Sequence, residues 1–486
     1  MANPIFEIID AYQPVNGDLL IFPFLNKDTP LFDEGTVGTI PVPIDPPTEP
    51  GGSKTIYVGP LKGEKCVVRT VRIDKKFIPL SEALKQKVAD HLKIAQDEGL
   101  NRIIIVLKSS ESIDLVKSCM EGTILGGYKF DRYLSEKKDP VTVNCLYDGK
   151  LNKTEREEIA LYQKLYTWVN TARDMLNEPP SVINPVSLAQ RFQELGKQAG
   201  LKVTVWDEKK IKKEKMGALL AVGQGSSSPP RLVIGEHKVR SAKGHLILVG
   251  KGVTFDTGGY CLKPADAQIG MKYDMAGAAA CFCAACAISQ AKLPINVTVI
   301  TPLCENAISS TAYKTTDIIV TRSGKSVQVD NTDAEGRLIL ADALDLASEK
   351  RPDWLVDVAT LTGACVVALG EDIAGIMGQS RELLDLIREI GNSEGELFWE
   401  LPLHLPYSEQ LKTESADIKN IGSRWGGSIT GALFLKEFVP DDIPWVHADI
   451  AGPAVKEEPL GHLGKGAKGF GVKTLFSLAR RLSGKK

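Results

Sequence analysis

The segment HLILVGKGVTFDTGG, residues 245–259, combines an apolar run with a glycine-rich turn. The run from His245 to Gly250 has the length and composition of a strand buried on both faces, as in sheets covered by helices. Lys251 and Asp256 follow among four glycines, which let the backbone approach other groups closely. The segment therefore predicts a covered α/β sheet with polar residues just past the end of one strand.

The sequence around this strand alternates between short apolar runs and helical patterns. Strands are expected at 202–206, 231–235, 296–303 and 354–359, and helices at 186–199, 277–291 and 338–349. In open α/β sheets, active sites gather at the carboxyl ends of strands. The polar clusters of this chain fall at such positions.

The chain has 486 residues, a length that favours two domains. Strand-like runs at 19–24 and 102–108, a helical stretch at 80–98 and a Pro/Gly loop at 40–54 make the N-terminal part α/β but show no catalytic pattern. Helical spacing from 154 to 176 stops at prolines. We expect two α/β domains, of which the larger has a mixed sheet flanked by helices: a smaller N-terminal domain over 1–152 with an oligomeric or regulatory role, a connecting helix over 153–180 and a C-terminal catalytic domain over 181–486.

The charge is nearly balanced, with 59 Lys and Arg against 61 Asp and Glu, so no global positive field favours nucleic acid or an anionic membrane. The first ten residues lack the pattern of a secretory signal. No apolar run reaches the ~18 residues of a membrane span, and the nearest, Met275 to Ile288, is typical of a buried helix. These features predict a cytoplasmic protein.

Nine scattered cysteines suit reduced thiols in a reducing compartment. Cys281, Cys283 and Cys286 lie close enough to suggest a metal site, but no fourth Cys or nearby His accompanies them. They are interpreted as core residues of a helix.

Four carboxylates, those of Asp256, Asp274, Asp333 and Glu335, follow or precede apolar elements. The strand-like segment 326–330 runs into NTDAEGR, residues 331–337, and if this continues as extended chain, Asp333, Glu335 and Arg337 share one face. Carboxylates that converge in an apolar half repel unless divalent metals neutralise them. Carboxylate oxygen suits Zn²⁺, Mn²⁺, Mg²⁺ or Co²⁺, and the six histidines form no HxxxH pair.

The segment NTDAEGRL, residues 331–338, is the hallmark octapeptide of the cytosolic leucine aminopeptidase family, the M17 peptidases, which this chain closely resembles. The resemblance covers about residues 165–480 and extends to VGKG at 249–252, FDTGG at 255–259, MKYDM at 271–275, ATLTGA at 359–364 and HADIAG at 447–452. Two loops depart from the family: Thr315-Thr316-Asp317 replaces Pro-Gly-Asp, and Lys468 replaces the Thr of Ala-Thr-Gly-Phe-Gly. Neither loop contains a metal or catalytic position.

The resemblance implies an aminopeptidase that removes Leu or another apolar N-terminal residue from short peptides with a bridging hydroxide between two metals. It implies that one metal is held by Asp256, Asp333 and Glu335, and the other by Lys251, Asp256, Asp274 and Glu335. Lys251 would bind as a neutral amine, so Arg should not replace it. Lys263 would stabilise the oxyanion, and Arg337 would hold a bicarbonate ion as general base. The substrate would be bound by Met271, Asn331, Thr360, Gly363 and Ala451.

The family resemblance also implies a homohexamer. Two alternative functions are weighed. A DNA-binding or regulatory protein on the same fold would use a basic patch such as the lysines at 209–215, although none of the ligand positions is broken. A two-metal phosphohydrolase shares the carboxylates, but the lysine ligand and the intact octapeptide argue against it.

Overall fold

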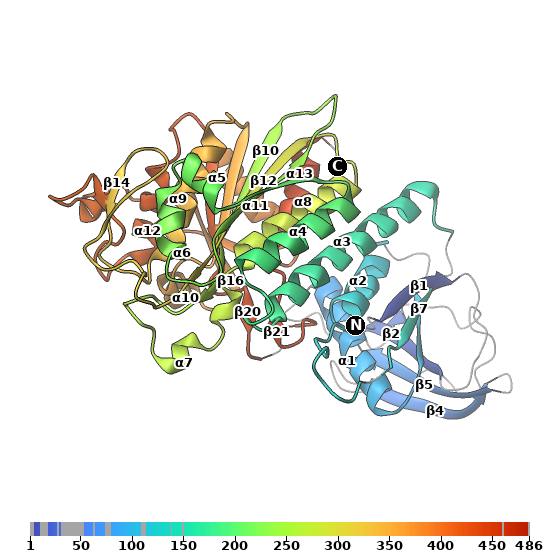
Figure 1. The fold of residues 1–486 in the computed structure, drawn as a ribbon. Helices are drawn as coiled ribbons and strands as arrows, with labels where there is room; N and C mark the ends of the chain where they lie inside the picture. Colours follow the sequence, from blue (N-terminus) through green and yellow to red (C-terminus); the bar gives the residue numbers. More distant parts are fainter. Residues whose placement is uncertain are drawn as a thin grey trace. The chain divides into compact units, whose positions relative to one another are not determined.

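The computed structural model describes residues 4–9, 18–26, 29–30, 53–61, 64–72, 79–107, 113–137, 139–147, 150–458 and 461–484. The chain divides into two compact units (Figure 1), Met1–Asn170 with Glu457–Gly466 and Thr171–Lys456 with Ala467–Lys486. The expected connecting helix is α3, Lys153–Asn177, and the division falls inside it. The chain is thus mixed α/β with a smaller N-terminal unit, as predicted.

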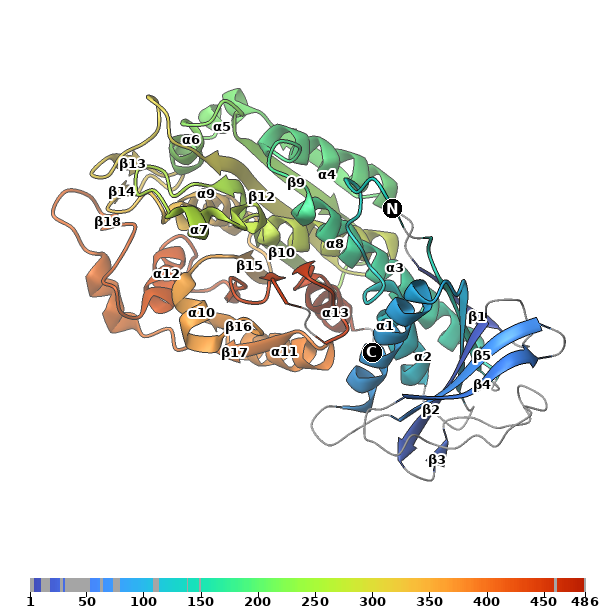
Figure 2. The same cartoon turned by 90° about the horizontal axis from the view of Figure 1, so that it is seen from below.

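The first unit has a sheet whose strand order is β1-β7-β6-β2-β5-β4, with β3 paired to β2. The strands are β1 (Ile5–Ile9), β2 (Asp18–Asn26), β3 (Thr29–Pro30), β4 (Ser53–Leu61), β5 (Glu64–Arg72), β6 (Arg102–Leu107) and β7 (Thr142–Tyr147). Helices α1 (Leu80–Asp97) and α2 (Ile113–Ile124) lie side by side (Figure 2). The loop expected at 40–54 lies outside the described residues, except that Ser53 and Lys54 already belong to β4.

The second unit is built on a larger mixed sheet, whose strand order is β17-β16-β19-β15-β10-β12-β9-β8, with β11 paired to β12. Strands β12, β10, β15 and β19 run parallel, whereas β8, β9 and β16 pair antiparallel to their inner neighbours. The strands are β8 (Lys202–Trp206), β9 (Arg231–His237), β10 (His245–Gly250), β11 (Gly252–Asp256), β12 (Asn296–Asn306), β15 (Trp354–Ala359), β16 (Ile373–Gly378), β17 (Leu397–Glu400) and β19 (Trp445–Asp449).

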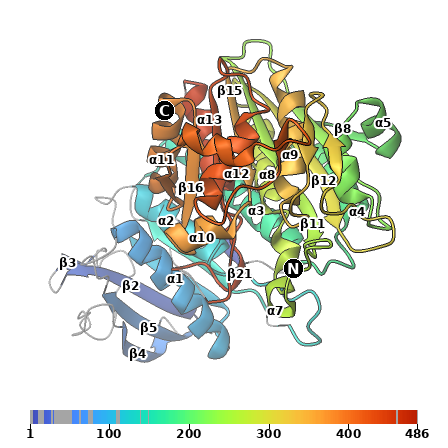
Figure 3. The same ribbon diagram turned by 90° about the vertical axis from the view of Figure 1, so that its left-hand side faces the viewer.

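Helices cover both faces of this sheet (Figures 1 and 3). Helix α8 packs against β10, β12 and β15 on one face, next to α4 and α13, and α9 packs against the same three strands on the other face, next to α6 and α12. These helices are α4 (Pro185–Ala199), α6 (Gly217–Gly223), α8 (Ala276–Gln290), α9 (Glu335–Ser348), α12 (Gly427–Lys436) and α13 (Val472–Leu482). The strand at 245–250 is buried from both sides, as its continuous apolar run predicts.

Shorter elements complete the unit and carry its loops. They are α5 (Glu208–Lys213), α7 (Ala265–Gln268), η2 (Met271–Tyr273), β13 (Ile318–Val320), β14 (Ser326–Gln328), α10 (Gly363–Leu369), α11 (Arg381–Ser393), η3 (Leu405–Leu411), β18 (Ile418–Lys419), β20 (Val455–Lys456) and β21 (Gly466–Ala467).

The longest apolar stretch of the sequence contains helix α8. The stretch Ala265–Gln290 is long and apolar enough to pass as a membrane span, but 83% of its most apolar window is buried inside the protein. Small Ala, Gly and Cys side chains let α8 lie close to the sheet. Burial raises the pKa of the Cys281, Cys283 and Cys286 thiols, which opposes the thiolate that a metal would require. The three cysteines are core residues of this helix.

Candidate metal centre and substrate pocket

The position of Lys251 is set by the end of strand β10. It follows β10, its backbone N–H donates to Val358 O at 3.0 Å, and its carbonyl accepts from Ala278 N at 2.8 Å. Only glycines permit this close approach, since a Cβ on Gly277 would lie 2.0 Å from Val358 O and one on Gly250 would lie 2.5 Å from Gly277 O. The backbone around Lys251 is therefore fixed between β15 and the start of α8.

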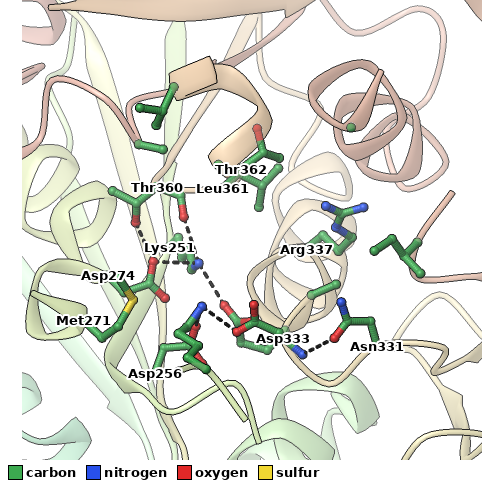
Figure 4. A pocket seen from close by; sticks show the side chains of 18 of the residues that line it. Lys251, Asp256, Met271, Asp274, Asn331, Asp333, Arg337, Thr360, Leu361 and Thr362 are labelled. Atoms are coloured by element: carbon green, nitrogen blue, oxygen red, sulfur yellow. Dashed lines mark hydrogen bonds and ion pairs between the residues drawn. The ribbon is translucent and has the colours of Figure 1, made fainter. Parts of the chain in front are cut away.

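The Lys251 amine lies between two carboxylates in the buried end of the site (Figure 4). Its Nζ is 2.8 Å from Asp274 Oδ1 and 2.9 Å from Glu335 Oε1, and it donates to Thr360 O at 2.9 Å. Burial acts to lower the pKa of this amine, but Asp274, Glu335 and Asp256 outweigh it and hold the pKa above its ordinary value. Without a metal ion, Lys251 is thus a charged amine that partly balances the carboxylates.

A second lysine, Lys263, contacts the other carboxylates. Its Nζ is 3.0 Å from Asp256 Oδ2 and 2.5 Å from Asp333 Oδ1. Burial opposes the charge of Lys263, but the two carboxylates raise its pKa above the ordinary value. Burial, together with Asp256 and Glu335, raises the pKa of Asp333 to about 6 despite the nearby lysine. The repulsion among the carboxylates is therefore larger than the attraction of two lysines can offset.

The carboxylate cluster fits divalent metal ions. Asp256, Asp333 and Glu335 each offer a ligand oxygen, and these oxygens lie within 4.8 Å of one another. Asp274 Oδ2 and Glu335 Oε2 are buried and find no hydrogen-bond partner among the described residues. Four carboxylates against two lysine amines leave two negative charges, and buried carboxylates without partners are unfavourable unless cations compensate them.

The expectation that residues 331–337 form extended chain is wrong. Strand β14 ends at Gln328, and Glu335 is the first residue of helix α9. Asp333 lies in the turn between them, where its N–H donates to Asn331 Oδ1 at 2.8 Å. The helical pattern of the following residues extends three positions further toward the N-terminus than predicted, so Glu335 and Arg337 project from a helical turn instead of a strand.

Arg337 is buried in the first turn of α9, where it is 6% exposed. Its Nη1 donates to Asn420 O at 3.0 Å, and its Nε has no hydrogen-bond partner in the described part of the chain. Burial lowers the pKa of Arg337 to about 10, against the opposing effect of Glu335 and Asp449. A buried guanidinium with unused donors fits a planar oxyanion.

All twelve residues that the sequence singled out line one cavity of about 500 Å³. They are Lys251, Asp256, Lys263, Met271, Asp274, Asn331, Asp333, Glu335, Arg337, Thr360, Gly363 and Ala451. In Figure 4 Met271, Asp274 and Thr360 lie on one side of Lys251, and Arg337 lies apart from the carboxylates. The structure brings these residues together, and the role of each remains a prediction.

The chain is similar to known proteins over the region that contains these residues. A sequence model described as "Cytosol aminopeptidase family, catalytic domain" matches residues 170–476. A probable cytosol aminopeptidase of Aquifex aeolicus is 41% identical over 423 residues, 86% of this chain and 85% of that protein. The chain belongs to the cytosol aminopeptidase family. A probable cytosol aminopeptidase of Rhodopirellula baltica is 48% identical over 320 residues, 66% of this chain and 63% of the relative.

A solved structure extends the likeness to the whole fold. The bottromycin maturation enzyme BotP in complex with Mn matches with a TM-score of 0.84 at 30% identity, over 96% of this chain and 100% of that chain. Family membership makes this protein a metal-dependent aminopeptidase, and its carboxylate cluster fits that class.

Several residues of this aminopeptidase escaped the sequence argument. Asp449 is fully buried and accepts hydrogen bonds from Thr362 Oγ1 at 2.7 Å, from Leu361 N at 3.1 Å and from Ala451 N at 3.2 Å. It thereby ties the loop after β15 to the loop after β19, and both loops line the cavity. The segment HADIAG contained Asp449, and a lone acid inside an apolar strand was the signal.

Asn420 holds the octapeptide loop of this aminopeptidase in place. Its Nδ2 donates to Asn331 O at 2.6 Å, and its Oδ1 accepts from Asp330 N at 2.9 Å and from Asn331 N at 3.2 Å. The neighbouring loop and the first turn of α12 supply lining residues that were not predicted, namely Ile421, Ser423 and Arg424 from the loop and Gly427 and Thr430 from the helix. No periodicity or metal-ligand spacing marks this loop in the sequence.

Proposed function

We propose that this protein is a two-metal leucyl aminopeptidase that removes Leu or another apolar N-terminal residue from short peptides. The observation that carries the proposal is the single cavity in which four carboxylates, two lysines and a buried arginine meet an apolar wall. Within the family, peptide breakdown in the cytoplasm is the role that we expect.

The carboxylate arrangement supports two divalent ions. Asp256, Asp333 and Glu335 would hold one ion, while Lys251 and Asp274 would hold the other together with Asp256 and Glu335. Bound divalent ions supply a water acidic enough to attack a carbonyl near neutral pH and polarise the scissile carbonyl. Zn²⁺ or Mn²⁺ is proposed, with Mg²⁺ or Co²⁺ as alternatives, and the BotP structure was solved with Mn.

Lys263 is proposed to stabilise the negative charge that develops on the scissile carbonyl oxygen. Its amine is held at the carboxylate end of the cavity by Asp256 and Asp333, and its raised pKa keeps it charged at neutral pH. A positioned cation at a developing oxyanion is commonly worth about 3 to 4 kcal/mol, or a factor of ~10² to 10³ in turnover.

Arg337 is proposed to hold a bicarbonate ion. The Nε of this buried guanidinium has no hydrogen-bond partner among the described residues, and burial lowers the pKa of Arg337 to about 10. A bicarbonate ion held there would supply a general base. This assignment accounts for a pocket whose described lining contains no histidine.

The apolar wall supports a preference for an apolar N-terminal residue. Met271, Gly363 and Ala451 line it, with Ala454 and Val366 beside them. A Cβ on Gly363 would meet nothing within 4 Å, so space is available there for a substrate side chain. Leu is proposed because its branched, apolar side chain matches this apolar wall.

The homohexamer and the oligomeric or regulatory role of the N-terminal unit stay predictions of the resemblance. The DNA-binding alternative gains no support from the family matches. In the lysine-rich segment 209–215, Lys210 is 2.6 Å from Glu214 Oε1 and its Nζ lies 5.2 Å from the Trp206 ring centroid, which is typical of a solvated face.

The deciding experiment measures Leu release from leucyl-p-nitroanilide after chelation and after re-addition of Mn²⁺ or Zn²⁺. Activity should return with metal and fall by about 10² to 10³ in kcat in Lys263→Ala. Lys412→Ala, at an exposed lysine that pairs with Glu409, is the matched control and should behave as the wild type. No release with any divalent ion and any aminoacyl substrate would refute the proposed function.

A further inference from the structure

We propose that Arg424 binds a substrate carboxylate on the leaving-group side of the scissile bond, so that the enzyme favours peptides with a negative charge close behind the cleaved residue. The carboxylate is the C-terminus of a dipeptide or the side chain of an acidic second residue. This inference rests on the proposed function and concerns the same cavity.

The cationic side chains that line the cavity differ in the number of acids that they contact. Lys251 and Lys263 each contact two carboxylates, and Arg337 donates to a backbone carbonyl. Arg424 also lines the cavity, and in the described ranges of the chain its guanidinium contacts the Trp425 ring and no acid. Apart from Arg337, for which a bicarbonate ion is proposed above, Arg424 is the cation of the described lining that is left to pair with a ligand.

The loop that carries Arg424 is held in place by its own contacts. Ser423 N donates to Gln410 Oε1 at 2.9 Å, and Trp425 N donates to Ser423 Oγ at 3.3 Å. The Arg424 guanidinium carbon lies 5.2 Å from the centroid of the Trp425 ring. A cation over an aromatic face keeps its edge N–H groups available, and those groups match the two oxygens of a carboxylate.

A peptide substrate has the opposite distribution of charge. The proposed function places its N-terminal amine among the metal-binding carboxylates, and a dipeptide carries its carboxylate up to about 7 Å away. The first residue of α12, Gly427, lines the cavity as Arg424 does, and no side chain in the described part of the chain caps this helix. The positive end of α12 therefore adds to the attraction that the guanidinium provides.

The expected effect is moderate because Arg424 is exposed to solvent. Exposed ion pairs contribute little, and bidentate carboxylate pairs contribute somewhat more. We expect a factor of about 3 to 10 in kcat/KM for the charged substrate relative to its neutral analogue, decreasing as salt is added.

The test compares two substrate pairs in the metal-loaded enzyme: Leu-Ala with Leu-Ala-amide, and Leu-Asp-amide with Leu-Asn-amide. Each kcat/KM is divided by that for leucyl-p-nitroanilide, which carries no carboxylate and reports on the metal site. Arg424→Gln should reduce the acid-to-neutral ratio of at least one pair about 3- to 10-fold, and Arg424→Lys should restore part of it. The pair that responds identifies the source of the carboxylate.

Arg388→Gln is the matched control, because Arg388 is an exposed arginine on α11 that pairs with Asp385. Its ratios should equal those of the wild type. If both ratios in Arg424→Gln stay at their wild-type values while leucyl-p-nitroanilide is hydrolysed, Arg424 does not bind substrate and the inference fails. If the wild type hydrolyses none of the five substrates, the proposed function fails first.

Discussion

Gly336→Ala tests whether helix α9 fixes the Lys251 amine. A Cβ built on Gly336 lies 2.5 Å from Lys251 Cε, 2.7 Å from Nζ and 2.8 Å from Cδ. Unstrained contacts between such atoms begin at about 3.5 Å, so the lysine chain must shift by about 1 Å. The amine is held by Asp274, Glu335 and Thr360, and the shift breaks at least one of these contacts.

The magnitude follows from the function that we propose for Lys251. A displacement of about 1 Å in a catalytic arrangement costs on the order of 10² in rate, and changes next to metal ligands cost about 10- to 100-fold in metal affinity. The stability of the fold should change less than the turnover rate and the metal affinity. Alanine gains about 1 kcal/mol of helix propensity over glycine, which offsets part of the 1 to 3 kcal/mol typical of overpacking.

The assay is calorimetric titration of the metal-free protein with Mn²⁺ and Zn²⁺, followed by leucyl-p-nitroanilide turnover at saturating metal and thermal unfolding. Gly363→Ala is the matched control for metal affinity, because its Cβ would meet nothing within 4 Å. If Gly336→Ala binds metal and turns over within twofold of the wild type, α9 does not constrain the amine and the steric reasoning is refuted.

Three further predictions follow from single residues. Gly363→Ala should shift the kcat/KM preference from leucyl toward alanyl substrates about tenfold, because a methyl group occupies space at the apolar wall. Asp449→Asn should lower kcat/KM about tenfold or more while calorimetric metal affinity stays within threefold, because it loosens Leu361 and Ala451 but touches no carboxylate of the cluster. Burial, with Arg173 and Lys456 nearby, lowers the pKa of Lys468 to about 8. The folded chain thus binds fewer protons than the unfolded one between about pH 8 and ~10.4, and stability rises with pH in that window. Lys468→Met should therefore abolish this rise of stability between about pH 8 and ~10.4, as denaturant titrations of both proteins at the two pH values would show.

The strand ends were predictable because two independent signals coincide at them. A continuous apolar run marks a strand that is buried on both faces, and the glycines behind it mark close approach of backbone. At Lys251 both signals hold, and the structure explains the glycines by contacts that a Cβ would obstruct. The order of the strands in the sheet could not be predicted, because the pairing of β9 with β12 depends on contacts between residues far apart in sequence.

The loop at 421–427 could not be predicted for a related reason. Its residues have no periodicity, and their approach to the cavity depends on where α12 packs, against α9 and α10. The hydrogen bonds of Asn420 to the octapeptide loop become visible only when residues 90 positions apart meet. Long-range contacts of this kind decide which residues of 421–427 line the cavity.

The error at the octapeptide has a consequence for the chemistry. In extended chain, Glu335 and Arg337 would point to one face, and the guanidinium would compete with metal for the carboxylates. In the first turn of α9 the two residues are about 200° apart around the helix axis. Glu335 then joins the cluster with Lys251, and Arg337 contacts Asn420. Figure 4 shows Arg337 apart from Asp256, Asp274 and Asp333. A helix start, whose positive end also favours the Glu335 carboxylate, would thus let residues two positions apart in one motif serve the proposed metal and bicarbonate sites without neutralising each other.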